Sequence, residues 1–229
     1  MPLNVVMIGP PGAGKGTQSE RLCRLYAIPR IATGDILREA VQANTTLGRS
    51  VHEIIAAGQL VDDQVMISLI DERLSRADVR NGFILDGFPR TVVQAQALDG
   101  IMEGRGAIVP IVIVVPEHEL VRRLTMRLVC GACGATFGQA GMGLAAPVDD
   151  CCPRCGGVLA PREDDNADVV RQRQQLFAQI TNPLVEYYQN YPTFMSIDGL
   201  QTPDAVTADL RTHIEAISTV GRQGGRARA

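Results

Sequence analysis

Short apolar runs recur along the chain and alternate with segments of helical periodicity. Residues 3–8 form the first run, which has the length of a buried strand and ends at a glycine. Further buried strands are expected over residues 83–85, 108–115 and 194–197, and a fifth is expected near residues 30–32. Unbroken apolar strands separated by helices are typical of a parallel sheet with helices on both faces. The pattern therefore predicts an α/β fold whose three-layer core contains a parallel five-stranded sheet.

Two segments interrupt this alternation. Residues 32–61 read as short helical pieces, and residues 126–165 contain five cysteines and a Gly/Ala-rich stretch with almost no helical period. We interpret both segments as insertions into the sheet domain. The core then consists of residues 1–31, 62–125 and 166–220. Residues 221–229 form a basic Gly/Arg/Ala tail, which we expect to be flexible.

A glycine-rich turn joins the first strand to a helix that is expected over residues 17–26. Residues 9–15 read GPPGAGK and match the pattern G-x-x-x-x-G-K. Glycines allow backbone N–H groups to point at a phosphate, and the helix N-terminus adds a partial positive charge. Lys15 supplies a compact charge for the terminal phosphates, and Thr17 carries the hydroxyl that is more common at the position of Gly16. The turn therefore predicts a phosphate-binding loop.

The composition strengthens the role of Lys15. The chain has 229 residues, with 22 Lys and Arg against 25 Asp and Glu, and Lys15 is the one lysine. A bias toward arginine is thus interrupted at a position where a planar guanidinium is too bulky. The formal net charge of −3 disfavours generic binding to nucleic acid.

The sequence also bears on location. No apolar run reaches the roughly 20 residues that a membrane span requires. The N-terminal residues lack the basic start and the cleavage site of a signal peptide. We therefore expect a cytoplasmic protein without a membrane partner. In that compartment the six cysteines are more often thiols or metal ligands than disulfides.

Four of these cysteines form two C-x₂-C knuckles. Cys130 and Cys133 are followed, after 18 residues, by Cys152 and Cys155. This spacing indicates a structural zinc site, because four thiolates fill a tetrahedral ion; a disulfide pair and a metal-free relic are the alternatives. Cys151 is left out, because Cys152 completes the knuckle.

The charge around the knuckles disfavours a nucleic-acid-binding role. Zinc knuckles also occur in ribbons that bind nucleic acid, but here Asp149, Asp150, Asp164 and Asp165 flank them in an acidic chain. Cys23 lies on the first expected helix and is read as a small buried hydrophobe.

Four motifs together resemble the adenylate kinase family. They are the phosphate loop, TGDILR at residues 33–38, LDGFPR at 85–90 and REDDN at 162–166. The motifs occur in family order and at similar spacing, so the resemblance spans about residues 3–215. It implies a P-loop core with a helical nucleoside monophosphate-binding insertion at 32–61 and a long lid at 126–165. Some family members carry a metal in that lid.

The resemblance also implies the residues of two nucleotide sites. Those expected to contact AMP are Thr33, Arg38, Gln59, Leu60, Val61, Gly87, Phe88, Pro89, Arg90, Gln94, Arg162 and Arg173. Those expected to contact ATP are Gly12, Ala13, Gly14, Lys15, Gly16, Thr17, Arg123, Arg127, Thr136, Phe137 and Gln201. Gln201 matches a position that acts through its carbonyl, and Thr33 and Gln94 suit an adenine acceptor.

Phosphoryl transfer between nucleotides explains the arginines. The acceptor is already an anionic phosphate oxygen, so the site needs charge neutralisation and positioning rather than a general base. The expected catalytic set is Lys15, Asp86, Arg90, Arg127, Arg162 and Arg173. Asp86 ends a buried strand, where ligands bind in open α/β sheets, and is placed to order Mg²⁺ through water.

We therefore expect an adenylate kinase that catalyses Mg·ATP + AMP ⇌ 2 ADP and balances the adenine nucleotides. Lid closure would keep water from the transferring group. The enzyme alternatives are another nucleoside monophosphate kinase and the use of GTP as donor. The non-enzyme alternative is a zinc-stabilised regulator that binds ATP without turnover. One chain suffices to clamp two nucleotides, so we expect a monomer.

Overall fold

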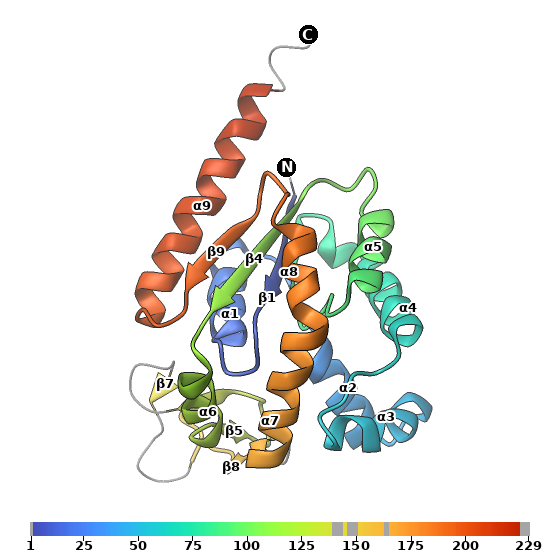
Figure 1. Ribbon diagram of the computed structural model, residues 1–229, viewed down its shortest axis with the longest axis vertical. Coiled ribbons are helices and arrows are strands. Elements are labelled where there is room, and N and C mark those ends of the chain that lie inside the picture. Colours follow the sequence, from blue (N-terminus) through green and yellow to red (C-terminus); the bar gives the residue numbers. More distant parts are fainter. Residues whose placement is uncertain (1, 139–143, 146–150, 163–164, 225–229) are drawn as a thin grey trace.

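A parallel five-stranded sheet forms the centre of the computed structural model, which describes residues 2–138, 144–145, 151–162 and 165–224. The strand order is β2-β3-β1-β4-β9 (Figure 1). The strands are β1 (Leu3–Ile8), β2 (Arg30–Ala32), β3 (Gly82–Asp86), β4 (Ile108–Val114) and β9 (Met195–Asp198). The predicted fold class is confirmed, and each predicted strand agrees with an observed one to within one residue at either end.

Helices cover both faces of this sheet (Figure 1). One face is covered by α1 (Lys15–Tyr26), α6 (Glu117–Thr125) and α9 (Pro203–Gly224). The other face is covered by α4 (Asp63–Leu74), α5 (Val92–Ile101) and α8 (Asn182–Tyr188). A 3₁₀ turn at Ala77–Val79 precedes β3, and α7 (Ala167–Leu176) continues into α8 through a π-helical turn at Phe177–Thr181.

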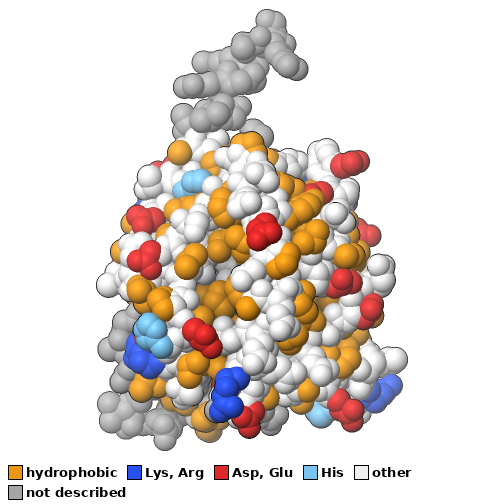
Figure 2. All heavy atoms as spheres, viewed as in Figure 1, with side chains coloured by type: hydrophobic (Ala, Val, Ile, Leu, Met, Phe, Trp, Pro, Cys, Tyr) orange, Lys and Arg blue, Asp and Glu red, His pale blue; other side chains and the backbone are white. Residues whose placement is uncertain are grey.

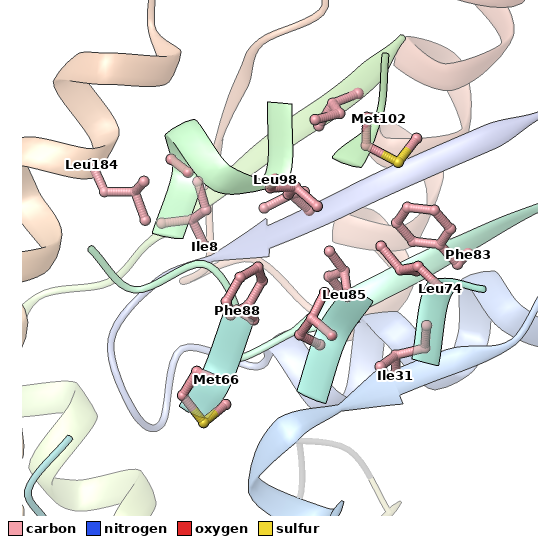
Figure 3. Close-up of a cluster of buried hydrophobic side chains, with 14 of the residues drawn as sticks. Ile8, Ile31, Met66, Leu74, Phe83, Leu85, Phe88, Leu98, Met102 and Leu184 are labelled. Atoms are coloured by element: carbon pink, nitrogen blue, oxygen red, sulfur yellow. The ribbon is translucent and has the colours of Figure 1, made fainter. Parts of the chain in front are cut away.

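The alternation of side chains along β1 divides the core into two clusters. Val5 and Met7 pack with α1 and α9, whereas Val6 and Ile8 pack with α4, α5 and α8. Successive side chains of a strand point to opposite faces, so an unbroken apolar run has to be covered on both sides. Figure 3 shows part of the second cluster, where side chains of β1 and β3 meet those of α4 and α5.

Helices occupy the first segment that interrupts the alternation. They are α2 (Thr33–Gln42) and α3 (Thr46–Ala56), which pack against each other. Their apolar side chains Leu37 and Val51 are buried and join the cluster around α4. The pair therefore rests on the core near the carboxyl ends of β2 and β3.

The second interrupting segment contains a small sheet with the order β7-β6-β5-β8. Its strands are β5 (Leu128–Cys130), β6 (Thr136–Gly138), β7 (Leu144–Ala145) and β8 (Leu159–Pro161). We call residues 126–165 the lid segment. Asp149, Asp150 and Asp164, which flank the knuckles in the sequence, lie outside the described residues.

Helix α9 continues to Gly224, so residues 221–224 of the C-terminal tail are helical. The flexibility of the tail stays a prediction. The segment between Pro203 and Gly224 contains no further proline, so its backbone N–H groups can continue the helical hydrogen bonds. Residues 225–229 lie outside the described part of the chain.

We expect Gly48→Ala to destabilise the packing of α2 against α3. A Cβ atom at Gly48 would lie 2.0 Å from the carbonyl oxygen of Ala40, and backbone cannot move aside as a flexible side chain can. Overpacking of this kind costs about 1–3 kcal/mol in the free energy of unfolding, which chemical denaturation would measure. Gly100→Ala is the control, because that helical position has nothing within 4 Å. Equal stability of the two variants would contradict the expectation.

Candidate functional site

The glycine-rich turn lies between the end of β1 and the start of α1 at Lys15. Gly12 and Gly14 have φ angles of 87° and 102°, a region that favours glycine. A Cβ at Gly12 would also lie 3.1 Å from the carbonyl oxygen of Leu120, so the loop packs tightly against α6. Gly14 is the N-cap of α1 and carries no side chain that could occupy the helix N-terminus. The first N–H groups of α1 are therefore placed to bind an anion.

The ammonium of Lys15 lies inside the curve of this loop. Its Nζ donates hydrogen bonds to the carbonyl oxygens of Gly9 at 2.6 Å and Pro10 at 3.0 Å. These carbonyls hold the charge at the helix N-terminus, next to the backbone N–H groups. The loop therefore combines three sources of positive potential: the ammonium, the N–H groups and the helix dipole.

Other charged groups gather around Lys15. Burial lowers the pKa of Lys15 to about 8, and the carboxylate of Asp86 opposes this shift. Three guanidinium groups act in the same direction as burial, namely those of Arg90, Arg173 and Arg127. Arg90 lies in the loop after β3, Arg173 lies on α7, and Arg127 lies at the start of the lid segment. The fold thus brings four predicted catalytic cations together at one end of the sheet.

A pocket opens beside this cationic cluster, between α2, α3 and the loop after β3. It contains about 600 Å³ of empty space, including its open mouth. Most of the residues predicted to contact AMP line it: Thr33, Arg38, Gln59, Leu60, Val61, Gly87, Arg90, Gln94 and Arg173. Gly34, Leu37, Ile55, Gly58 and Met66 complete the lining.

Three of the predicted acceptor residues are placed differently. Among the described residues, Phe88, Pro89 and Arg162 do not contribute to this lining. The Phe88 ring is fully buried in the core cluster next to Met66 and Leu85 (Figure 3). An aromatic ring in an apolar core supports the loop that carries Arg90, and a contact of Phe88 with AMP stays a prediction.

Two hydrogen bonds to one carbonyl join α2 to the loop after β3 at one end of the pocket. The Oγ1 of Thr33 and the Nε of Arg90 both donate to the carbonyl oxygen of Gly87, at 3.0 Å and 2.9 Å. Gly87 has a φ of 90°, and a Cβ there would lie 2.8 Å from the Thr33 hydroxyl. Only glycine therefore allows α2 and the loop after β3 to meet at this point.

A carboxylate to which the sequence analysis gave no role bridges two of the arginines. Asp165, with a side chain 3% exposed, accepts from Nε of Arg127 at 2.7 Å and lies 3.5 Å from Nη1 of Arg173. It belongs to the REDDN motif, of which only Arg162 had been assigned a role. The presence of Asp165 in the same motif as Arg162 is the sequence signal that could have identified it.

A second set of ion pairs surrounds the predicted magnesium carboxylate. Asp86 accepts from Nη2 of Arg30 at 2.7 Å, and the same guanidinium donates to Asp35 at 3.1 Å. Asp35 also pairs with Arg38. Sequence reasoning missed Arg30, because it lies at the start of β2 and no motif contains it.

The remaining residues predicted to contact ATP are Arg123, Thr136, Phe137 and Gln201. Arg123 donates to Glu119 at 2.8 Å and to the carbonyl oxygen of Gly199 at 2.9 Å, so it ties α6 to the turn that carries Gln201. The Phe137 ring is 1% exposed and packs inside the lid segment. Thr136 on the same strand is exposed. These contacts with a donor base stay predictions.

The four predicted metal ligands form one cluster. The Sγ atoms of Cys130, Cys133, Cys152 and Cys155 all lie within 4.8 Å of one another. The Sγ distances are 3.5 Å for Cys130 to Cys155 and 3.6 Å for Cys133 to Cys152. Four thiolates about 2.3 Å from a tetrahedral zinc ion would be nearly 3.8 Å apart, so the cluster fits such an ion.

The two knuckles share one backbone geometry. In each, the N–H of a left-handed glycine donates to the carbonyl of the first cysteine: Gly134 to Cys130 at 3.0 Å, and Gly156 to Cys152 at 2.8 Å. Backbone N–H groups, led by that of Cys133, lower the pKa of the Cys130 thiol to about 6. Cys151 is exposed and lies outside this cluster.

The fold and the site define a class of protein. A P-loop at the end of β1 faces an arginine-lined pocket across the carboxyl edge of a parallel sheet, which is typical of P-loop phosphotransferases. A comparison with family models matches residues 7–192 to the family described as adenylate kinase. The chain therefore belongs to the adenylate kinase family.

Individual relatives agree with this assignment. Adenylate kinase of Archaeoglobus fulgidus is 42% identical over 221 residues, which cover 95% of this chain and 100% of the relative. Adenylate kinase of Desulforudis audaxviator is 46% identical over 211 residues, covering 91% and 97% of the two chains. That of Moorella thermoacetica is 44% identical over 226 residues, covering 98% and 99%.

The helices and the surface charge of the described residues complete the description. Among the described residues, no helix has both the length and the apolar character needed to cross a membrane. On the face seen in Figure 2, acidic and basic side chains are scattered among apolar and neutral ones, and the described residues there form no continuous basic patch.

We expect an amine-acylating reagent to modify Lys15 with half-maximal rate near pH 8. Only the neutral amine reacts, and the pKa of Lys15 is lowered to about 8 from an ordinary value of 10.5. Peptide mapping by mass spectrometry would separate this label from that on the α-amino group, and Lys15→Met is the control. ATP should protect Lys15, and equal labelling with and without ATP would contradict the assignment.

Proposed function

We propose that this chain transfers the terminal phosphoryl group of ATP reversibly to AMP, giving two molecules of ADP, and so balances the adenine nucleotides. The observation that carries the proposal is the convergence of Lys15, Arg90, Arg127 and Arg173 between the P-loop and the pocket beside α2 and α3. Two anionic nucleotides that meet head to head need such a set of cations. A regulator that only binds ATP would not need the arginines that line this pocket.

The P-loop residues would hold the donor. Backbone N–H groups of Gly12, Ala13, Gly14, Gly16 and Thr17 would bind the phosphates of ATP. Lys15 would exchange the loop carbonyls for phosphate oxygens, because a charged acceptor binds an ammonium more strongly than a neutral carbonyl does. Arg127 would contact the same phosphates from the lid side, and Arg123 and the carbonyl of Gln201 would lie near the base.

The pocket would hold the acceptor. Arg38 and Arg90 would bind the phosphate of AMP, and Thr33, Gln94 and the stretch Gln59, Leu60 and Val61 would surround its adenine. The attacking atom is a phosphate oxygen that already carries negative charge. The arginines would therefore aim it at the donor and offset repulsion between the two anions, and proton removal is unnecessary.

The lid would complete the site. Arg162 and Arg173 would close over the transferring group, with Asp165 fixing the neighbouring guanidinium groups. Closure would exclude water, which would otherwise compete with AMP for the phosphoryl group.

Magnesium would accompany ATP. Asp86 fits this role, because its carboxylate ends β3 and lies only 3.7 Å from where a Cβ of Gly16 would stand in the P-loop. Magnesium is usually held by one or two carboxylates, water and substrate phosphates. Bound magnesium would neutralise charge on the phosphate oxygens. Arg30 would then have to share Asp86 with the hydration shell of the ion.

The cysteine cluster would hold structural zinc. Its four thiolates leave no open coordination position, so the metal would stabilise the lid segment and take no part in the reaction. All six cysteines lack disulfide partners, which supports a cytoplasmic location. The P-loop and the acceptor pocket are built from one chain, which supports a monomer. The partners would be ATP, AMP and ADP, with no nucleic acid or membrane.

Incubation with Mg²⁺ and ADP alone tests the reaction. We expect equal amounts of ATP and AMP, because ADP then serves as both donor and acceptor. Lys15→Met should fold normally and lower the rate by roughly a hundredfold or more, as loss of a transition-state charge contact does. No conversion of ADP would overturn the proposal. A panel of AMP, CMP, UMP and GMP with ATP or GTP would then test the other kinases.

Removal of single cysteines tests the metal site. Cys152→Ser should lose zinc and lower the melting temperature of the lid segment more than that of the core, because metal binding contributes folding free energy. Cys151→Ser is the matched control and should retain one zinc per chain. Metal analysis and calorimetry provide the measurements. Equal zinc content in the two variants would contradict the assignment.

A further inference from the structure

The side-chain amide of Gln94 is fixed at both ends. It lines the acceptor pocket but is only 2% exposed. Its Oε1 accepts a hydrogen bond from the backbone N–H of Arg90 at 2.7 Å. Its Nε2 donates to Oδ1 of Asp63, also at 2.7 Å. One N–H and one lone pair of the amide remain for a ligand.

Asp63 is itself held in place. It is the first residue of α4, where the helix N-terminus favours a negative charge. Its second oxygen, Oδ2, accepts from the hydroxyl of Thr91 at 3.1 Å. The same hydroxyl accepts from the backbone N–H of Gln94 at 3.1 Å and so caps α5. Asp63, Thr91 and Gln94 therefore form a closed ring of hydrogen bonds between α4 and α5.

This ring determines which end of the amide faces which way. A carboxylate only accepts hydrogen bonds, and a backbone N–H only donates them. A flipped Gln94 would place its Oε1 against the Asp63 carboxylate and its NH₂ group against the Arg90 N–H. Two favourable contacts would become an acceptor facing an acceptor and a donor facing a donor, in a buried position where unpaired polar groups are costly.

We propose that Asp63 is a positioning residue that sets the purine specificity of the acceptor pocket by preventing Gln94 from flipping. The proposal rests on the proposed function, in which Gln94 contacts the acceptor base. Adenine presents an acceptor at N1 and an amino donor at N6, which match the free N–H and lone pair of the amide. A 6-oxopurine presents a donor at N1 and an acceptor at O6, and so requires the flipped amide.

The test compares AMP and IMP as acceptors, since IMP is the 6-oxopurine nucleotide without the extra amino group of GMP. Asp63→Asn keeps the shape of the side chain, but its amide can donate as well as accept. The ratio of kcat/KM for AMP to that for IMP should fall about tenfold, through a gain with IMP as well as a loss with AMP. The Arg90 N–H still opposes the flip, so some discrimination should remain.

Asp62→Asn is the matched control. Asp62 is the adjacent N-cap of α4 and loses the same charge in this substitution, but its side chain accepts from the backbone N–H groups of Gln64 and Val65 rather than from Gln94. Asparagine caps helices as well as aspartate. The AMP to IMP ratio of Asp62→Asn should equal that of the parent protein. If Asp63→Asn fails to fold, Asp63→Ser replaces it, because a hydroxyl also donates and accepts.

Gln94→Leu separates this proposal from the proposed function. If Gln94→Leu abolishes the discrimination but Asp63→Asn and Asp63→Ser retain the parental ratio, the role of Asp63 is wrong and the base contact of Gln94 stands. If Gln94→Leu itself retains the parental ratio, the assignment of Gln94 to the base is wrong. A fall in activity with both nucleotides at an unchanged ratio would indicate a purely structural Asp63 and would also overturn the proposal.

Discussion

Mutual repulsion among Lys15 and the arginines around it must be offset before the two nucleotide sites can exist side by side. Lys15 and three arginines lie close enough for each arginine to lower the pKa of the lysine, together with burial. Such a cluster is stable only where anions offset it. The fold supplies carboxylates at fixed points: Asp165 between Arg127 and Arg173, and Asp86 against Arg30. Nucleotide phosphates would supply further negative charge. The local cluster of cations would therefore attract two polyanions although the whole chain has a net charge of −3.

The lid segment meets a different constraint, because it has little apolar surface to bury. Among its described residues, the buried cluster comprises Cys130, Ala135, Phe137, Cys152 and Leu159. So small a core does not hold a segment of this length by hydrophobic burial alone. A metal bound by four thiolates can replace the missing core. A bound metal would also let the segment move as one body. Two ion pairs connect the segment to the core: Asp165 with Arg173 of α7, and Arg154 with Glu20 of α1.

In the proposed function, the acceptor pocket would separate two tasks, binding the phosphate of AMP at one end and its base at the other. Its phosphate end is built from charged groups and from the carbonyl of Gly87, which aligns Thr33 and Arg90. Its base end is built from neutral groups with a fixed direction of hydrogen bonding, of which Gln94 is the clearest case. Charged contacts to phosphate contribute binding free energy but do not distinguish between bases, whereas directed hydrogen bonds to the base do. The backbone of the turn between β3 and α5 connects the two ends.

The strands, the P-loop and the two cysteine knuckles could be predicted from the sequence alone, because each depends on residues within a few positions of one another. An apolar run predicts a buried strand, and two C-x₂-C pairs predict a thiolate cluster, wherever they lie in the fold. Motif order also indicated most of the acceptor pocket, although Phe88 proved to belong to the core. Only the tertiary structure decided the strand order and the partners of the charged and amide groups. Arg30 meets Asp86, Arg127 meets Asp165, and Gln94 meets Asp63 across separations of 56, 38 and 31 residues. Such pairs depend on distance and direction in space, which no local pattern encodes.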